Sequence, residues 1–195
     1  GKLDVPGVAA VEINISCPNV KAGGIAFGTN PQAAAAVVRQ VKDHTSKVVI
    51  TKLSPNVTSI TELALAVEAA GTDVISLINT LIGMKIDVER QRPVLGNITG
   101  GLSGPAVRPV AVRMCYEVAQ KVKVPLIGMG GIMNAADALE FFLAGANAVA
   151  VGTGNFVDPT LAVDICGGLL EYMDRHQVKQ IKDLVGLALP GGKRC

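Results

Sequence analysis

Aromatic and charged residues are scarce in this sequence of 195 residues. Trp is absent, aromatic residues make up 3%, charged residues make up 17%, and the formal net charge is +2. Because no basic run is interleaved with aromatic residues, the sequence gives no reason to expect a nucleic-acid-binding surface. No uninterrupted apolar run reaches the ~18 residues of a membrane-spanning helix, and no signal-peptide pattern opens the sequence. The sequence therefore predicts a soluble cytoplasmic protein.

Cysteine is also sparse and is not arranged as a metal site. The four cysteines are Cys17, Cys115, Cys166 and Cys195. None of them belongs to a CxxC pair and no histidine cluster accompanies them, so we expect no zinc or iron–sulfur site built by this chain. A chain of this length can bury a sizeable core without disulfides, and we expect no disulfide framework.

The apolar residues that are present follow an alternating strand and helix pattern. Hydrophobic residues make up 49% of the sequence, mostly Ala, Val, Ile and Leu, together with 22 Gly. This mixture suits strands buried on both faces and packed against Ala-rich helices. The pattern predicts strands at residues 8–15, 47–53, 74–79, 124–129 and 148–151, helices at 31–44, 58–70, 109–122, 134–144 and 159–176, and a short turn at 181–184.

Local signals support several of these boundaries. Asn30 precedes Pro31, as expected for an N-cap followed by proline in the first turn of a helix. Gly71 is a candidate for the residue that ends the helix at 58–70. Residues 80–108 form a long glycine-rich segment to which we assign no strand or helix; loops of this length are usually functional or disordered.

Five consecutive strand–helix units predict an α/β fold with parallel strands and right-handed crossovers. A doubly wound sheet and part of a (β/α)8 barrel both remain possible. Each strand ends in a polar or glycine-rich segment, which favours the barrel, where loops at the strand carboxyl ends form the active site. A closed barrel takes ~250 residues. We therefore expect residues 1–195 to be the C-terminal portion of one barrel domain, with its first strands missing.

Polar residues follow the first three predicted strands. The first strand leads into Cys17, flanked by Asn14 and Asn19; a thiol there is a nucleophile or general base if its pKa falls, although free Cys is often a buried small hydrophobe. Lys52 ends an apolar strand, so it must either find a negative partner or extend to solvent. Asn79 and Thr80 end the next strand. Together these residues indicate one polar rim, with amides suited to a planar heterocycle.

Glycine motifs follow the later strands. They are "GGLSG" at 100–104, "GMGG" at 128–131 and "GTGN" at 152–155. Glycine lets backbone N–H groups approach a phosphate, and barrels often bind phosphate in the loops after their last two strands. The motifs predict a phosphorylated ligand, although βα turns also use glycine for purely structural reasons. They do not form the GxGxxG dinucleotide fingerprint.

These segments, taken together, resemble the dihydroorotate dehydrogenases, most closely their NAD-linked class 1B catalytic subunits. The resemblance rests on "INISCPNVKAGG", "TKLSPNVT", "INTLIGMKID", "NITGGLSGPA", "IGMGGI" and "AVGTGNF", in order along the whole chain. It implies an FMN-binding (β/α)8 TIM barrel that oxidises (S)-dihydroorotate to orotate in de novo pyrimidine (UMP) biosynthesis. It also implies a homodimer, and a heterotetramer with a partner subunit that carries FAD and a 2Fe–2S cluster and passes electrons to NAD+.

The resemblance also implies a role for individual residues. Cys17 matches the base that takes the C5 proton while hydride passes from C6 to FMN, and class 2 enzymes of the family use serine there. Lys52 matches the catalytic lysine beside the flavin. The remaining matches are Asn14 for flavin and substrate, Asn19, Asn79 and Thr80 for substrate, Ile78 and Gly104 for the flavin, and Gly130, Gly131, Gly152 and Thr153 for its phosphate.

The sequence departs from the family pattern in having no counterpart of the first three strands. An N-terminal fragment of the same barrel is therefore a further expected partner. Three alternatives stay open: a related FMN barrel acting on pyrimidines, similar to part of dihydropyrimidine dehydrogenase; an inactive flavin-binding fragment; and a phosphate-binding barrel without flavin.

Overall fold

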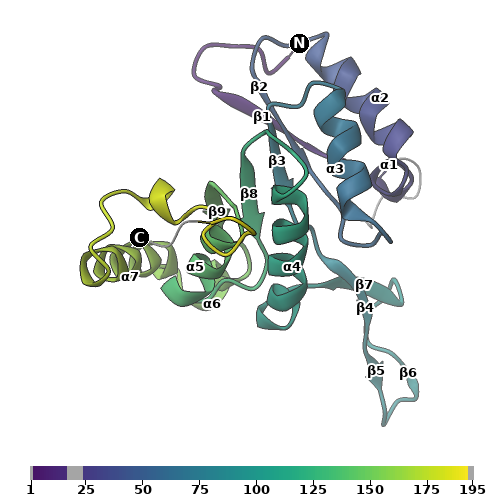
Figure 1. The fold of residues 1–195 in the computed structure, drawn as a ribbon. Coiled ribbons are helices and arrows are strands. Elements are labelled where there is room, and N and C mark those ends of the chain that lie inside the picture. Colours follow the sequence, from purple (N-terminus) through teal and green to yellow (C-terminus); the bar gives the residue numbers. More distant parts are fainter. Residues whose placement is uncertain (1, 17–23, 193–195) are drawn as a thin grey trace.

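A single parallel sheet organises the chain. The computed structural model describes residues 2–16 and 24–192. In this part of the chain the sheet has five strands in the order β1-β2-β3-β8-β9, and every neighbouring pair is parallel (Figure 1). The strands are β1 (Ala10–Asn14), β2 (Val48–Lys52), β3 (Val74–Leu77), β8 (Leu126–Met129) and β9 (Ala148–Ala150). Their order in the sheet follows the chain, unlike a doubly wound sheet, in which the order reverses.

The helices that follow these strands pack side by side along the sheet. The long ones are α2 (Pro31–Lys42), α3 (Ile60–Ala69), α4 (Arg108–Ala119), α5 (Ala135–Leu143) and α7 (Leu161–Arg175). Each of them contacts the next in this series. Shorter helices are α1 (Gly24–Thr29), α6 (Gly154–Val157) and the 3-10 turns η1 (Pro105–Val107) and η2 (Ile181–Leu184). The predicted strand–helix series is thus confirmed, with each strand and long helix one to several residues shorter than expected and the turn at 181–184 as predicted.

The two faces of the sheet differ in burial. In β2, Val49 and Thr51 are fully buried, whereas Val48 is 44% exposed and Ile50 and Lys52 are half-buried. A strand alternates its side chains between faces, so β2 has a helix-covered face and a second, more open face. A row of helices along one face of a parallel sheet is the arrangement of a barrel wall.

Side-chain caps begin three of the helices. Asn30 Oδ1 accepts a hydrogen bond from Ala33 N at 2.9 Å, with Pro31 in the first turn of α2, as the sequence predicted. Ser59 Oγ accepts from Glu62 N at 3.4 Å at the start of α3, and Asn134 Oδ1 accepts from Asp137 N at 2.9 Å at the start of α5. These bonds satisfy N–H groups that the first helical turn leaves without partners.

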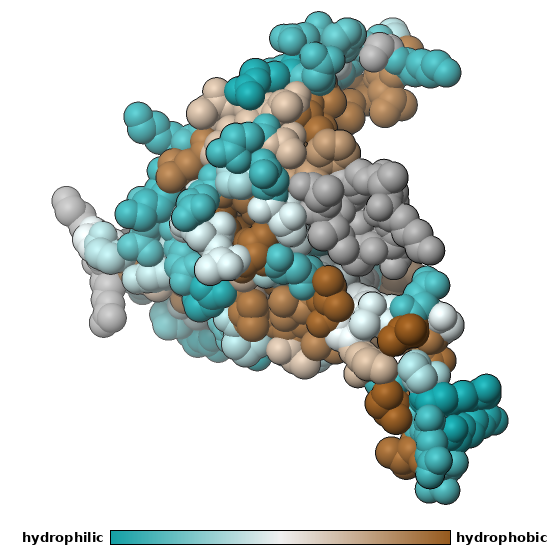
Figure 2. Space-filling view, turned by 90° about the vertical axis from the view of Figure 1, so that its right-hand side faces the viewer, coloured by the Kyte–Doolittle hydropathy of each residue, from teal (hydrophilic) through white to brown (hydrophobic). Residues whose placement is uncertain are grey.

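The segment at 80–108 contains four short strands that the sequence analysis did not assign. Strands β4 (Leu81–Met84) and β7 (Thr99–Leu102) pair antiparallel, and β5 (Ile86–Asp87) pairs with β6 (Arg92–Pro93). This hairpin projects from the body of the molecule, and Figure 2 shows apolar side chains exposed along it. Glycine is depleted in strands generally, so the glycines of β7 conceal the strand pattern.

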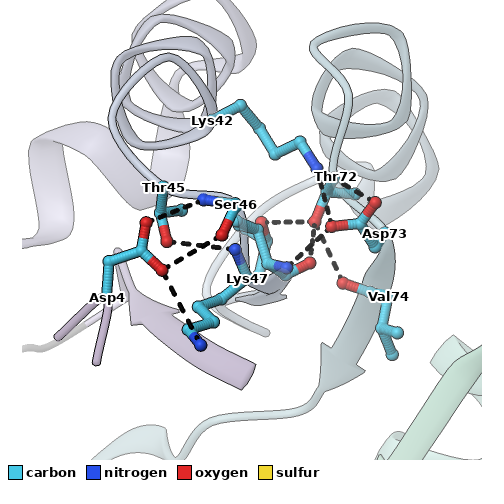
Figure 3. A network of polar contacts seen from close by, with 10 residues as sticks. Asp4, Lys42, Thr45, Ser46, Lys47, Thr72, Asp73 and Val74 are labelled. Carbon is cyan, nitrogen blue, oxygen red and sulfur yellow. Dashed lines mark hydrogen bonds and ion pairs between the residues drawn. The ribbon is translucent and has the colours of Figure 1, made fainter. Parts of the chain in front are cut away.

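A polar network ties α2 to the amino ends of β2 and β3 (Figure 3). Lys42 Nζ donates to both oxygens of Asp73, at 2.8 and 3.0 Å, and Val49 N donates to Asp73 Oδ2 at 2.7 Å. Thr72 Oγ1 lies 2.8 Å from Thr51 Oγ1. Partial burial raises the pKa of Asp73, but the hydrogen bonds from Lys42 and Val49 and the charge of Lys42 outweigh it and hold that pKa below its ordinary value. The network therefore stabilises the end of the sheet opposite the strand carboxyl ends.

Asp73→Asn is expected to lower the free energy of unfolding at pH 7 by about 1 kcal/mol, because the amide loses the charge that pairs with Lys42. An Asp with a lowered folded-state pKa stabilises the fold above its unfolded pKa, and this contribution is lost as pH falls through the folded pKa. Urea unfolding should thus show a difference between the two proteins that shrinks below pH ~4. Asp43→Asn, at the exposed end of α2, is the control. Equal effects of both substitutions would contradict the assignment.

Candidate active site

A cavity of about 210 Å³ lies at the carboxyl ends of the strands. Its walls come from the end of β2, the residues after β3, β8 and β9, and the return of the hairpin into η1. Nine residues that the sequence analysis singled out line it: Lys52, Ile78, Asn79, Thr80, Gly104, Gly130, Gly131, Gly152 and Thr153. The structure therefore brings together the residues of the polar rim and those of the glycine motifs, which lie up to about a hundred residues apart in the chain.

Lys52 has a negative partner, which is the first of the two possibilities that the sequence left open. Its Nζ lies 3.1 Å from Glu12 Oε1, and Ser76 Oγ donates to Glu12 Oε2 at 3.1 Å. The strand register sets Asn14 beside Lys52 and Lys52 beside Ser76. Glu12 was missed from the sequence, although its spacing of two from Asn14 places both on one face of β1.

Side-chain amides and hydroxyls form a second group next to the cavity. Asn79 Nδ2 donates to Ser16 Oγ at 2.6 Å and to Asn14 Oδ1 at 3.2 Å, and Asn79 Oδ1 accepts from Thr80 N at 2.8 Å. Asn14 does not line the cavity, but this network joins it to Asn79, which does. Ser16 is 2% exposed and was not singled out from the sequence.

Asn56 is a further residue that sequence reasoning missed. Its Nδ2 donates to the Thr80 carbonyl oxygen at 3.0 Å, and its Oδ1 accepts from Ile82 N at 2.8 Å. These bonds hold the chain where it leaves β3 and enters the hairpin. The amide in "TKLSPN" was the available signal, although an isolated Asn after a strand is ordinary turn chemistry.

The glycine loops leave backbone donors at the cavity. The N–H groups of Gly131, Gly152 and Thr153 make no hydrogen bond to another described residue, and a Cβ at Gly152 would meet no atom within 4 Å. Thr153 Oγ1 donates to Ser103 Oγ at 2.9 Å, which joins this loop to the hairpin return. Free N–H groups, an unfilled space at Gly152 and the Lys52 ammonium form a donor set that fits a phosphorylated ligand with a polar ring.

Gly131 is needed for packing as well as for any ligand. Its φ is +76°, and a Cβ there would lie 2.7 Å from the Gly104 carbonyl oxygen and 2.9 Å from Arg108 Cβ. The neighbouring Gly130 has φ +127°. Both positions therefore require glycine because of the backbone conformation that the loop after β8 adopts.

Two predicted site residues, Cys17 and Asn19, lie outside the described residues, as does Cys195. Of the other cysteines, Cys166 is exposed on α7 and Cys115 is buried in α4. Burial raises the pKa of the Cys115 thiol to about 12, so it is protonated at neutral pH and unsuited to act as a base. Across residues 2–16 and 24–192, no three His, Cys, Asp or Glu side chains form a group that could hold a metal ion.

None of the helices in the described part of the chain has both the length and the apolar character to cross a membrane.

The sequential parallel sheet, its row of helices and the cavity at the strand carboxyl ends define part of the wall of a (β/α)8 barrel. A crystal structure of DHODH in complex with ferulenol from Eimeria tenella has the same fold, with a TM-score of 0.77 at 22% identity over 91% of this chain and 53% of that one. The family model for dihydroorotate dehydrogenase matches residues 2–173. The chain belongs to the dihydroorotate dehydrogenase family.

Curated relatives are more similar in sequence. A dihydroorotate dehydrogenase B (NAD(+)) catalytic subunit from Desulforudis audaxviator is 64% identical over 189 residues, which cover 96% of this chain and 62% of the relative. The subunit of the same name from Geotalea uraniireducens is 59% identical, covering 95% of this chain and 61% of the relative. The chain thus spans about six-tenths of the length of the relatives it matches.

Gly131→Ala is expected to lower the free energy of unfolding by roughly 1–3 kcal/mol, because its φ is positive and its Cβ would contact the Gly104 carbonyl oxygen. Gly152→Ala is the matched comparison, with an expected change below ~0.5 kcal/mol, since a Cβ there meets open space. Chemical denaturation without added ligand measures both. Equal destabilisation of the two variants would contradict this difference in packing.

Proposed function

We propose that this chain forms the larger part of the active site of a dihydroorotate dehydrogenase that oxidises (S)-dihydroorotate to orotate in UMP biosynthesis. The observation that carries the proposal is the single cavity that unites nine residues matched to FMN or substrate in this family. The sequence identity of 64% to an NAD(+)-type catalytic subunit favours NAD+ as the final electron acceptor. It also disfavours a pyrimidine-reducing relative and a barrel that binds phosphate without flavin.

FMN is the cofactor that we assign to this cavity, because the residues that line it match flavin positions of the family. When bound, FMN supplies a hydride acceptor for the C6 hydrogen of the substrate. Gly130, Gly131, Gly152 and Thr153 offer backbone N–H donors for its phosphate. Lys52 provides a fixed positive charge that favours the electron-rich form of the ring, while Glu12 limits that effect by balancing the charge. Ile78 and Gly104 line the same cavity and would contact the bound flavin through an apolar side chain and through backbone.

The substrate lies against the amide group of the rim. Its polar edge exchanges hydrogen bonds with four side chains, those of Asn14, Asn19, Asn79 and Thr80. The same side chains bind the planar product, orotate. Cys17 takes the C5 proton. Its immediate neighbour Ser16 is buried and accepts a hydrogen bond from Asn79. Cys17 thus directly follows, in the chain, a residue bound to one of the side-chain amides proposed to bind the substrate.

Electron transfer beyond FMN requires a partner. The relatives are named catalytic subunits, which implies a second kind of subunit in their assemblies. We assign FAD and a 2Fe–2S cluster to that partner, in a heterotetramer built on a homodimer of catalytic subunits in the cytoplasm. Three further strands, from an N-terminal segment of the same barrel, complete the wall between β1 and β9.

Anaerobic spectroscopy of the full-length gene product tests the proposal. A flavin absorption spectrum that bleaches on addition of dihydroorotate is expected. No flavin spectrum, and no change after FMN is added, would contradict it and favour an inactive fragment. Turnover of uracil or thymine in place of dihydroorotate would instead favour the pyrimidine-reducing relative.

Cys17→Ala is expected to slow reduction of the bound flavin by dihydroorotate by about 10²–10⁴-fold, because the C5 proton loses its base. Cys17→Ser should also slow it strongly, since a hydroxyl is a weaker base than a thiolate. Stopped-flow absorbance measures both variants, with flavin content as a check on integrity. Cys166→Ala, on the exposed surface of α7, is the control. Normal reduction by Cys17→Ala would remove Cys17 from the role of base.

Glu12→Gln is expected to raise the midpoint potential of the bound flavin. The ammonium of Lys52 would lose the carboxylate 3.1 Å away and would favour negative charge on the ring more strongly. A reductive titration against a reference dye measures the potential. Glu62→Gln removes the same charge from an exposed position on α3 and serves as the control. The idea fails if the potential is unchanged, or if it shifts equally in both variants.

A further inference from the structure

A partly buried ion pair lies just outside the cavity, between α4 and α5. Arg108 Nη1 is 2.6 Å from Asp137 Oδ1, and the Asp137 side chain is only 7% exposed. Neither residue lines the cavity. A carboxylate this deeply buried needs both a charge partner and hydrogen bonds, so its surroundings hold it in one orientation.

The second oxygen of Asp137 holds the loop after β8. Asp137 Oδ2 accepts from Met133 N at 2.9 Å, and Asp137 N donates to Asn134 Oδ1 at 2.9 Å. Met133 lines the cavity together with Gly130 and Gly131. The carboxylate therefore anchors the far end of the glycine loop to the first turn of α5.

Arg108 stands at the start of α4, directly after the η1 turn that carries Gly104 to the cavity. The loop after β8 packs on this turn, because a Cβ at Gly131 would lie 2.9 Å from Arg108 Cβ and 3.1 Å from Arg108 N. The Arg108–Asp137 pair thus joins two separate walls of the cavity. Both walls carry positions that the proposed function assigns to the flavin.

Glu140 contributes less to this arrangement. Its Oε2 is 3.3 Å from Arg108 Nε, but its side chain is 47% exposed. Arg108 Nε itself donates no hydrogen bond to any residue of the described chain. Asp137 therefore makes the closer contacts of the cluster, an ion pair with Arg108 at Oδ1 and a hydrogen bond from Met133 N at Oδ2.

We propose that Arg108 and Asp137 are positioning residues that set the glycine loop of residues 130–133 against Gly104 in the geometry that grips the phosphate of FMN. The proposal rests on the proposed function and deepens it. The pair does not touch the ligand. It acts on N–H groups whose direction must be fixed before the phosphate arrives, because mobile donors would lose conformational entropy on binding.

Flavin affinity with and without the phosphate separates this role from general stabilisation. The full-length gene product is stripped of flavin and titrated with FMN and with riboflavin, which lacks the phosphate, by quenching of flavin fluorescence. Asp137→Asn is expected to weaken FMN binding about tenfold, because the neutral amide loses the ion pair with Arg108 and the hydrogen bond from Met133 N is no longer charge-assisted. It should change riboflavin binding less than about twofold. The phosphorus resonance of bound FMN should move toward that of free FMN.

Two further variants keep the test decisive if Asp137→Asn folds poorly. Arg108→Gln with Asp137→Asn removes both charges, so no buried charge is left unpaired, and should show the same selective loss of FMN affinity. Glu117→Gln breaks the exposed Arg113–Glu117 pair on the same helix and should leave both affinities unchanged. Thermal unfolding of each flavin-free variant records the stability change separately.

Each other outcome overturns the proposal. Equal losses for FMN and riboflavin would mean that the pair only stabilises the fold, and unchanged affinities would mean that the loop needs no anchor; both results leave the proposed function intact. A wild-type protein that binds neither flavin would overturn the proposed function and the positioning role together.

Discussion

Five strands run in one direction in this sheet, and their shared direction determines where each strand-end side chain lies. Parallel pairing brings all the carboxyl ends to one edge, because each connection must return through a helix before the next strand begins. Lys52, Asn79 and Gly152 are separated by long stretches of chain, yet they line one cavity for this reason alone. The chemistry of the site therefore depends first on strand direction and register.

The two ends of the sheet differ in whether their polar groups have partners within the chain. At the amino ends, Lys42, Asp73 and the Val49 N–H form a closed set in which every partner is supplied by the chain itself. At the carboxyl ends, the N–H groups of Gly131 and Gly152 have no partner among the described residues. Unsatisfied donors are tolerated where a ligand or water can bind them. Stability and binding are thus separated along the strand axis, as is general in barrel enzymes.

Much of this arrangement could be predicted from the sequence, because it depends on local patterns. Strand and helix order follow from hydrophobic periodicity, and the cap at Asn30 follows from a neighbouring proline. Glu12 and Asp137 could not be assigned, since their partners Ser76, Lys52 and Arg108 are distant in sequence and become neighbours only through register and helix packing. The hairpin at 80–108 was missed because its glycines conceal the alternation of its strands.

The glycine motifs "GMGG" and "GTGN" look equivalent in the sequence but do not carry the same information. Gly131 has a positive φ, and a Cβ at this position would come too close to Gly104 and Arg108. The fold would therefore require glycine there whether or not a ligand binds. Gly152 has neither constraint, and a side chain at that position would extend only into the cavity. A glycine that packing does not demand is the stronger sign of close approach by another molecule. The "GTGN" motif is therefore direct evidence for a ligand. The "GMGG" motif is only indirect evidence, because its glycines are needed for the conformation of the loop that Asp137 anchors.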